Sequence, residues 1–144
     1  MDVFFYGVFM DEQILHDQGL SPSNPRFATL KGYRLRIAQR ANLVVDSKSS
    51  TCGVIIDLPP DDVLKLYSTP SVSDYQPVSV CARLEDDSEQ PAVCYLLPPD
   101  KSQQGSNTEY AKKLYRLARK LHFPDHYLGE IQLASDSNQR LDTD

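Results

Sequence analysis

Short apolar runs rich in valine, isoleucine, phenylalanine and tyrosine recur through the first hundred residues of this chain. Runs of this kind, bounded by glycine, proline and polar turns, are typical of β-strands. They predict strands at residues 3–9, 26–38, 42–45, 51–58, 77–84 and 91–97. About six crowded strands with helices between them indicate an α+β fold, a small mixed β-barrel or strongly coiled sheet. Because so small a closed sheet is filled by its own side chains, we expect a ligand to enter at a rim.

Helices are predicted between and after these strands. Two short ones are expected at 11–18 and 60–67. The clearest helix is 107–122, in which apolar residues recur at helical spacing opposite a basic face. Ser106 and Glu109 are spaced as a capping box at its start. The basic face is interpreted as solvated surface rather than as a binding site.

The length and charge of the chain limit its class. Its 144 residues suffice for one domain, expected at 1–134 with a last short helix at 125–131, before a flexible acidic tail at 135–144. The formal net charge of -5 disfavours nucleic acid and anionic lipid as partners. The apolar stretches are too short to span a bilayer, and the start lacks the basic segment of a signal peptide. We therefore expect a cytoplasmic protein with neither a nucleic-acid nor a membrane partner, of undetermined oligomeric state.

The cysteines do not suggest a metal site or a disulfide framework. Cys52, Cys81 and Cys94 each lie in a strand-like run, and neither they nor the histidines show metal-ligand spacing. We expect three buried thiols and no metal.

A glycine interrupts the first predicted strand, in the segment FFYGVFM. Glycine inside a strand costs up to about 1 kcal/mol relative to alanine, and it often marks close approach of a backbone or a ligand. Gly7 lies where the strand gives way to the predicted helix, so the amides of Gly7 to Met10 could form a cradle for a carboxylate. A plain bulge is the other interpretation, and both stay open.

The segment FFYGVFMDEQIL resembles the Tyr-Gly strand and loop that opens the gamma-glutamylcyclotransferase-like proteins. Further segments resemble the family in the same order: ATLKGYRLRI, CGVIIDLP, DYQPVSV and YAKKLYRLARKLHFPDHYLGEI. The resemblance covers residues 3–131 and lies in the order and spacing of these pieces. It implies a small barrel with surrounding helices, whose Tyr-Gly loop holds a small acidic metabolite at the barrel mouth without a cofactor. In this chain the loop residues are Tyr6, Gly7, Val8, Phe9 and Met10.

The resemblance also implies a reaction and exposes a departure from it. In active members a gamma-glutamyl amine attacks its own gamma-carbonyl and leaves 5-oxoproline, an intramolecular acyl transfer in which a carboxylate moves the proton. The family's Glu belongs to a Leu-Asp-x-x-Glu-Gly segment, and the matching position here is Ser68, or Thr69 if the register slips by one. Neither residue ionises near neutral pH. Since a general acid/base contributes about a hundred- to ten-thousand-fold, we expect weakened cyclisation in a retained pocket.

Other polar residues are candidates for the same site. Asp74 could replace the missing proton carrier, or it could be an ordinary turn residue. Ser71, Tyr67 and Tyr75 could orient a ligand, and Arg40 could pair with an anion or form a surface ion pair.

Two functions therefore stay open. The first is a weakened or silent relative that binds a small acidic or amide-bearing metabolite. The second is an enzyme acting on gamma-glutamyl or related amides, with Asp74, Tyr67 or Tyr75 as proton carrier.

Overall fold

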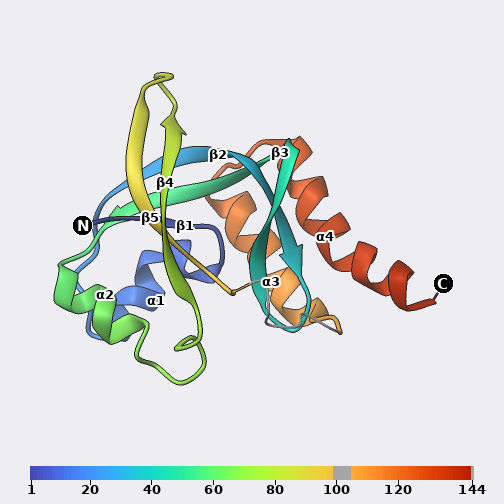
Figure 1. The fold of residues 1–144 in the computed structure, drawn as a ribbon, viewed down its shortest axis with the longest axis horizontal. Coiled ribbons are helices and arrows are strands. Elements are labelled where there is room, and N and C mark those ends of the chain that lie inside the picture. Colours follow the sequence, from blue (N-terminus) through green and yellow to red (C-terminus); the bar gives the residue numbers. More distant parts are fainter. Residues whose placement is uncertain (99–104, 144) are drawn as a thin grey trace.

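The computed structural model describes residues 1–98 and 105–143. Within them five strands close into a barrel in the order β1-β3-β2-β4-β5 (Figure 1). They are β1 (Asp2–Phe5), β2 (Ser23–Ile37), β3 (Ala41–Asp57), β4 (Gln76–Leu84) and β5 (Glu89–Leu96). Closure depends on β1, which pairs antiparallel with β3 and parallel with β5. The prediction of an α+β fold with a small mixed barrel is confirmed.

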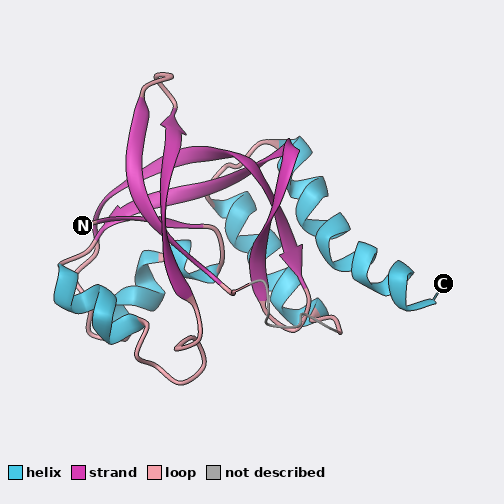
Figure 2. Ribbon diagram, in the orientation of Figure 1, coloured by secondary structure: helices cyan, strands magenta, loops and turns pink. Residues whose placement is uncertain are grey.

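The helices gather in two groups around the barrel. They are the 3-10 turn η1 (Val8–Met10), α1 (Glu12–Asp17), α2 (Pro60–Leu66), α3 (Thr108–Lys120) and α4 (Asp125–Thr143). Figure 2 shows α1 and α2 near the N-terminus and α3 with α4 at the other side. The last two helices contact each other, and α4 also packs on β2. None of the described helices is long and apolar enough to cross a membrane.

The β2–β3 ribbon corrects the prediction of separate strands at 42–45 and 51–58. β3 runs through both, and the polar residues between them lie where the register with β2 shifts. Tyr33 pairs with Val45 while Lys31 pairs with Ser50, so the extra residues of β3 lie opposite the single residue Gly32. Gly32 has a φ of +88°, a conformation that glycine adopts without strain. Gly32 thus lies at a bulge inside one continuous ribbon.

The first strand ends earlier than predicted. β1 stops at Phe5 instead of reaching Phe9, because the chain turns at Gly7 into the 3-10 turn. The Met10 amide donates to the Gly7 carbonyl across that turn at 3.0 Å. The loop therefore leaves the barrel wall at the barrel mouth.

The two helices nearest the C-terminus, α3 and α4, each differ from the prediction at one end. Asn107, not Ser106, caps α3, because its side-chain oxygen accepts the Tyr110 amide at 3.0 Å. α4 continues past the predicted 125–131 to Thr143. The flexibility expected of residues 135–144 stays a prediction.

The barrel interior and the inner helix faces form one apolar core. Its largest fully buried side chains include Phe4, Leu15, Ile37, Ile55, Leu66 and Leu114. Cys52 and Cys94 are buried, but Cys81 is exposed, so the prediction of three buried thiols was wrong for Cys81. Successive residues of a strand face opposite sides, and the neighbour Ala82 takes the buried side of β4. Within the described part of the chain no cluster of His, Cys, Asp and Glu could hold a metal ion.

Candidate functional site

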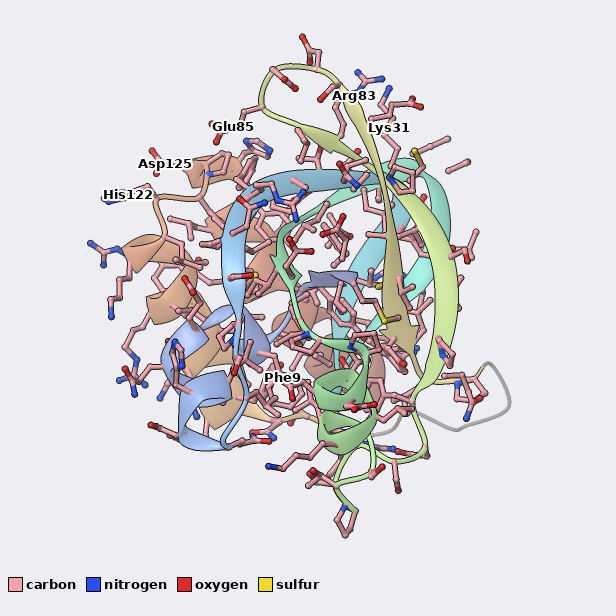
Figure 3. The ribbon with its side chains drawn as sticks, turned by 90° about the vertical axis from the view of Figure 1, so that its left-hand side faces the viewer. Phe9, Lys31, Arg83, Glu85, His122 and Asp125 are labelled. Atoms are coloured by element: carbon pink, nitrogen blue, oxygen red, sulfur yellow. The ribbon has the colours of Figure 1, made fainter. Side chains whose placement is uncertain are left out.

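A cavity of about 350 Å³ opens where the loop after β1, the β2–β3 turn, the end of α2 and the start of α3 meet. Its volume falls in the range of small-molecule sites. Half of the described lining residues are aromatic: Phe4, Phe5, Phe9, Tyr6, Tyr67, Tyr75, Tyr95 and Tyr110. Figure 3 shows Phe9 beside the green α2 helix, whereas Arg83 and Glu85 lie toward the far tip of the β4–β5 hairpin.

Most residues that the sequence suggested for a site lie together at this cavity. Those that line it are Tyr6, Gly7, Val8, Phe9, Arg40, Tyr67, Ser71 and Tyr75. Met10 does not, because its side chain is buried in the core. Ser68 and Thr69 are exposed beyond the end of α2, and the Ser68 hydroxyl donates to the Leu64 carbonyl. Asp74 lies next to the cavity, against Arg40.

Gly7 is a glycine because the Tyr110 hydroxyl lies against it. A Cβ built at Gly7 would collide with that oxygen, while the backbone itself is extended, with a φ of -117°. The Tyr110 hydroxyl in turn accepts the Val8 amide at 3.2 Å. With the Met10 amide bonded to Gly7, two of the four amides expected to grip an anion have partners inside the protein. The glycine thus permits close approach of a side chain from α3.

The aromatic walls of the cavity are fixed by ring contacts and hydrogen bonds. Tyr67 and Tyr95 stack with ring centroids 3.7 Å apart, and Phe9 meets Tyr67 edge-on at 6.3 Å. The Tyr6 hydroxyl donates to the Tyr95 carbonyl at 2.8 Å, which ties β1 to β5. The Tyr75 hydroxyl donates to the Ala41 carbonyl at 2.6 Å. Edge-on pairs such as that of Phe9 and Tyr67 add stability beyond the area they bury.

Arg40 is the only charged residue among the described residues lining the cavity, and it is already paired. Its two terminal nitrogens each donate to a carboxylate oxygen of Asp74 at 2.7 Å. Its guanidinium also lies 5.4 Å from the centre of the Tyr75 ring. The hydrogen bond to Asp74 raises the pKa of Arg40 above its usual value. The sequence suggested that Arg40 pairs with a ligand anion or forms a surface ion pair, and in the structure it forms an ion pair with Asp74.

The tyrosine hydroxyls of the cavity stay protonated at neutral pH. Burial raises the pKa of Tyr6, Tyr67 and Tyr75 above the ordinary value for tyrosine. Burial raises the pKa of Tyr110 to about 12, although the Val8 amide favours its ionised form. These groups can therefore donate hydrogen bonds, but they are poor acceptors of a proton from a substrate amine.

Alkaline pH is expected to destabilise the fold through these phenols. Tyrosine in an unfolded chain ionises near pH 10, whereas folded Tyr110 keeps its proton to about pH 12. Its contribution to stability is therefore complete below about pH 10 and is lost as the pH rises through the folded pKa. Thermal melts should give a lower melting temperature at about pH 11 than at about pH 8, with a smaller drop in Tyr110→Phe. Equal melting temperatures at both pH values would contradict the burial of these hydroxyls.

Sequence reasoning missed four aromatic residues that line the cavity: Phe4, Phe5, Tyr95 and Tyr110. Phe4 and Phe5 lie in the strand predicted at 3–9. Tyr110 fits the apolar side of the helix predicted at 107–122, and Tyr95 fits a strand predicted at 91–97. Their patterns indicate burial, and no signal in the sequence distinguishes a cavity wall from the core.

A five-stranded mixed barrel with a small-molecule-sized cavity beside a Tyr-Gly loop defines the structural class. The sequence matches the family model described as "Gamma-glutamyl cyclotransferase, AIG2-like" over residues 3–117. The chain therefore belongs to this family. No curated protein matches it by sequence.

Solved structures show the same fold at low sequence identity. An uncharacterized human protein is 17% identical with a TM-score of 0.78, and the alignment covers 91% of this chain and 85% of that one. A structure named gamma-glutamyl cyclotransferase is 16% identical, with a TM-score of 0.75 and the same two coverages. A yeast gamma-glutamyl cyclotransferase specific to glutathione is 14% identical, with a TM-score of 0.67 and 96% of each chain covered.

Proposed function

We propose that this protein binds a small acidic or amide-bearing metabolite at the barrel mouth and that its cyclotransferase activity is weakened or lost. One observation carries the proposal: among the described residues that line the cavity, none has a carboxylate. The resemblance implies that the family's Glu falls on Ser68, or on Thr69 if the register slips by one, and both residues are exposed beyond α2. The proposal places the protein in the cytoplasm, without a nucleic-acid or membrane partner, in keeping with its acidic composition.

The chemistry explains why a missing carboxylate matters. An attacking amine must lose a proton as it bonds to the carbonyl carbon, and the leaving amine must gain one. Arg40 is a cation and cannot accept that proton, and the tyrosine hydroxyls hold their own protons at neutral pH. The aromatic cavity can still confine a ligand. Without general acid/base help the reaction would be slower by about a hundred- to ten-thousand-fold.

The direct test is incubation with gamma-glutamyl amino acids and glutathione, followed by assay of 5-oxoproline. We expect no more product than from heat-denatured protein. The yeast enzyme specific to glutathione serves as a positive control, since it shares the fold. Product formation above the denatured control would overturn the claim of weakened or lost activity.

A second candidate function is an active enzyme in which Asp74 carries the proton. It is favoured by the position of Asp74, a half-buried carboxylate that contacts the cavity residue Arg40. If the assay gives product, this candidate requires that Asp74→Asn remove it and that Asp86→Asn, in the distant β4–β5 turn, leave it unchanged. Product formation that survives Asp74→Asn would contradict the role of Asp74.

A further inference from the structure

We propose that the cavity selects neutral ligands that join an aromatic or other planar apolar group to an amide, and that it disfavours carboxylates. This inference rests on the proposed binding function and narrows its ligand class. The reason is that the Arg40 guanidinium and two of the loop amides, which would otherwise bind an anion, already donate hydrogen bonds to acceptors inside the protein.

The guanidinium at the cavity is already bound to a carboxylate of the protein. Asp74 accepts from both terminal nitrogens of Arg40 at 2.7 Å, which is the bidentate geometry that a ligand carboxylate would need. The two side chains are only about one-third exposed, with relative accessibilities of 37% for Arg40 and 30% for Asp74. An incoming anion must therefore displace Asp74 and leave that carboxylate without its guanidinium, or approach a like charge. Either route weakens the binding of acids.

The loop amides give an independent indication in the same direction. The Val8 amide donates to the Tyr110 hydroxyl, and the Met10 amide donates to the Gly7 carbonyl. Backbone amides are the other element suited to hold an anion at this loop. Two donors from separate segments of the lining, Val8 and Arg40, thus already have acceptors inside the protein.

The cavity wall favours a planar group. Tyr67, Tyr95 and Phe9 form a continuous set of stacked and edge-on rings along the wall. Aromatic faces and edges bind other flat groups in the same two geometries. Gln39 and Ser71 add neutral polar side chains to the lining, which suit the hydrogen bonds of an amide. Aromatic surface with neutral polar groups is the complement of an aromatic amide.

A matched pair of indole probes tests the charge preference directly. The protein contains no tryptophan, so the fluorescence of an indole ligand can be excited selectively and its anisotropy followed on titration. N-acetyltryptophanamide is neutral, whereas N-acetyltryptophan carries a carboxylate at pH 7 and otherwise has nearly the same shape. We expect the dissociation constant of the neutral probe to be lower by roughly tenfold.

Variants assign the preference to the residues named. Asp74→Asn is expected to lower the dissociation constant of the acidic probe by roughly tenfold, because it removes the carboxylate that pairs with Arg40. The dissociation constant of the neutral probe should change little. Asp86→Asn removes the same charge in the β4–β5 turn and should leave both constants unchanged. Tyr67→Leu should weaken both probes, because it removes the ring between Phe9 and Tyr95. Thermal melts of each variant verify that it is folded.

The outcomes separate this inference from the proposed function. Equal affinity for the two probes, or an unchanged ratio in folded Asp74→Asn, would overturn the charge preference and leave binding at the cavity standing. Failure of both probes to bind would overturn the inferred ligand class. Formation of 5-oxoproline would instead overturn the claim of weakened or lost activity and leave a measured charge preference intact.

Discussion

Replacing Gly53 with alanine is expected to lower the free energy of unfolding by about 3 kcal/mol. Gly53 lies in β3 against β1, and a Cβ there would collide with the Phe5 carbonyl oxygen and the Phe4 ring. Phe5 is held by strand pairing with Val54, and the Phe4 ring is fully buried, so neither can move aside alone. Urea denaturation at neutral pH measures the loss from the shift of the midpoint.

Gly129→Ala provides the matched control for this substitution. Gly129 lies in α4 with open space around it, so an added methyl group meets nothing. The change should raise stability by up to about 1 kcal/mol, because alanine is the better helix former. A Gly53→Ala variant as stable as the parent would contradict the close approach of β1 and β3.

Gly7→Ala is expected to destabilise the protein by about 2 kcal/mol and to abolish binding of the neutral indole probe. The new methyl group takes the space of the Tyr110 hydroxyl, so this tyrosine must shift and release the Val8 amide. The shift moves a ring that lines the cavity. Urea denaturation and probe anisotropy together measure the two effects.

A second substitution in the same pair makes the cause testable. In Gly7→Ala combined with Tyr110→Phe, the colliding oxygen is gone and the nearest atom to the new Cβ is the ring Cζ at 3.8 Å, an ordinary contact. The double variant should therefore be more stable than Gly7→Ala alone, with a coupling energy of about 1 to 2 kcal/mol. Additive effects of the two changes would show that the collision is not what requires glycine at position 7.

The fold class could be predicted from the sequence because strand propensity is a local property. The β-branched and aromatic runs predicted most strands and the small mixed barrel. The joining of 42–45 and 51–58 into one strand could not be predicted, because the polar residues between them have a turn-like composition. Their place in β3 depends on pairing with β2 around Gly32, which is a tertiary contact.

The candidate site could be predicted only in part, for a similar reason. The resemblance predicted the Tyr-Gly loop, and side-chain chemistry suggested Arg40, Ser71 and Tyr75; all of these except Met10 line one cavity, whereas Ser68 and Thr69 do not. The contact between Gly7 and Tyr110 joins residues a hundred positions apart, so the spacing of residues near Gly7 carries no trace of it. The sequence likewise suggested that Arg40 binds a ligand anion or forms an ion pair within the protein, but it could not decide between them. The bidentate contact with Asp74 is a tertiary contact that only the structure shows.

The position of β1 in the barrel has a consequence for synthesis on the ribosome. Residues 2–5 are made before the other strands of the barrel, yet they pair on one side with residues 54–57 and on the other with β5 at Val93. The nascent chain must therefore keep Val3, Phe4 and Phe5 apart from other apolar segments until much of the sequence has emerged. Such long-range pairing slows folding, and it leaves intermediates with exposed apolar surface that are prone to aggregate. The first barrel strand to be synthesised is thus among the last to reach its native neighbours.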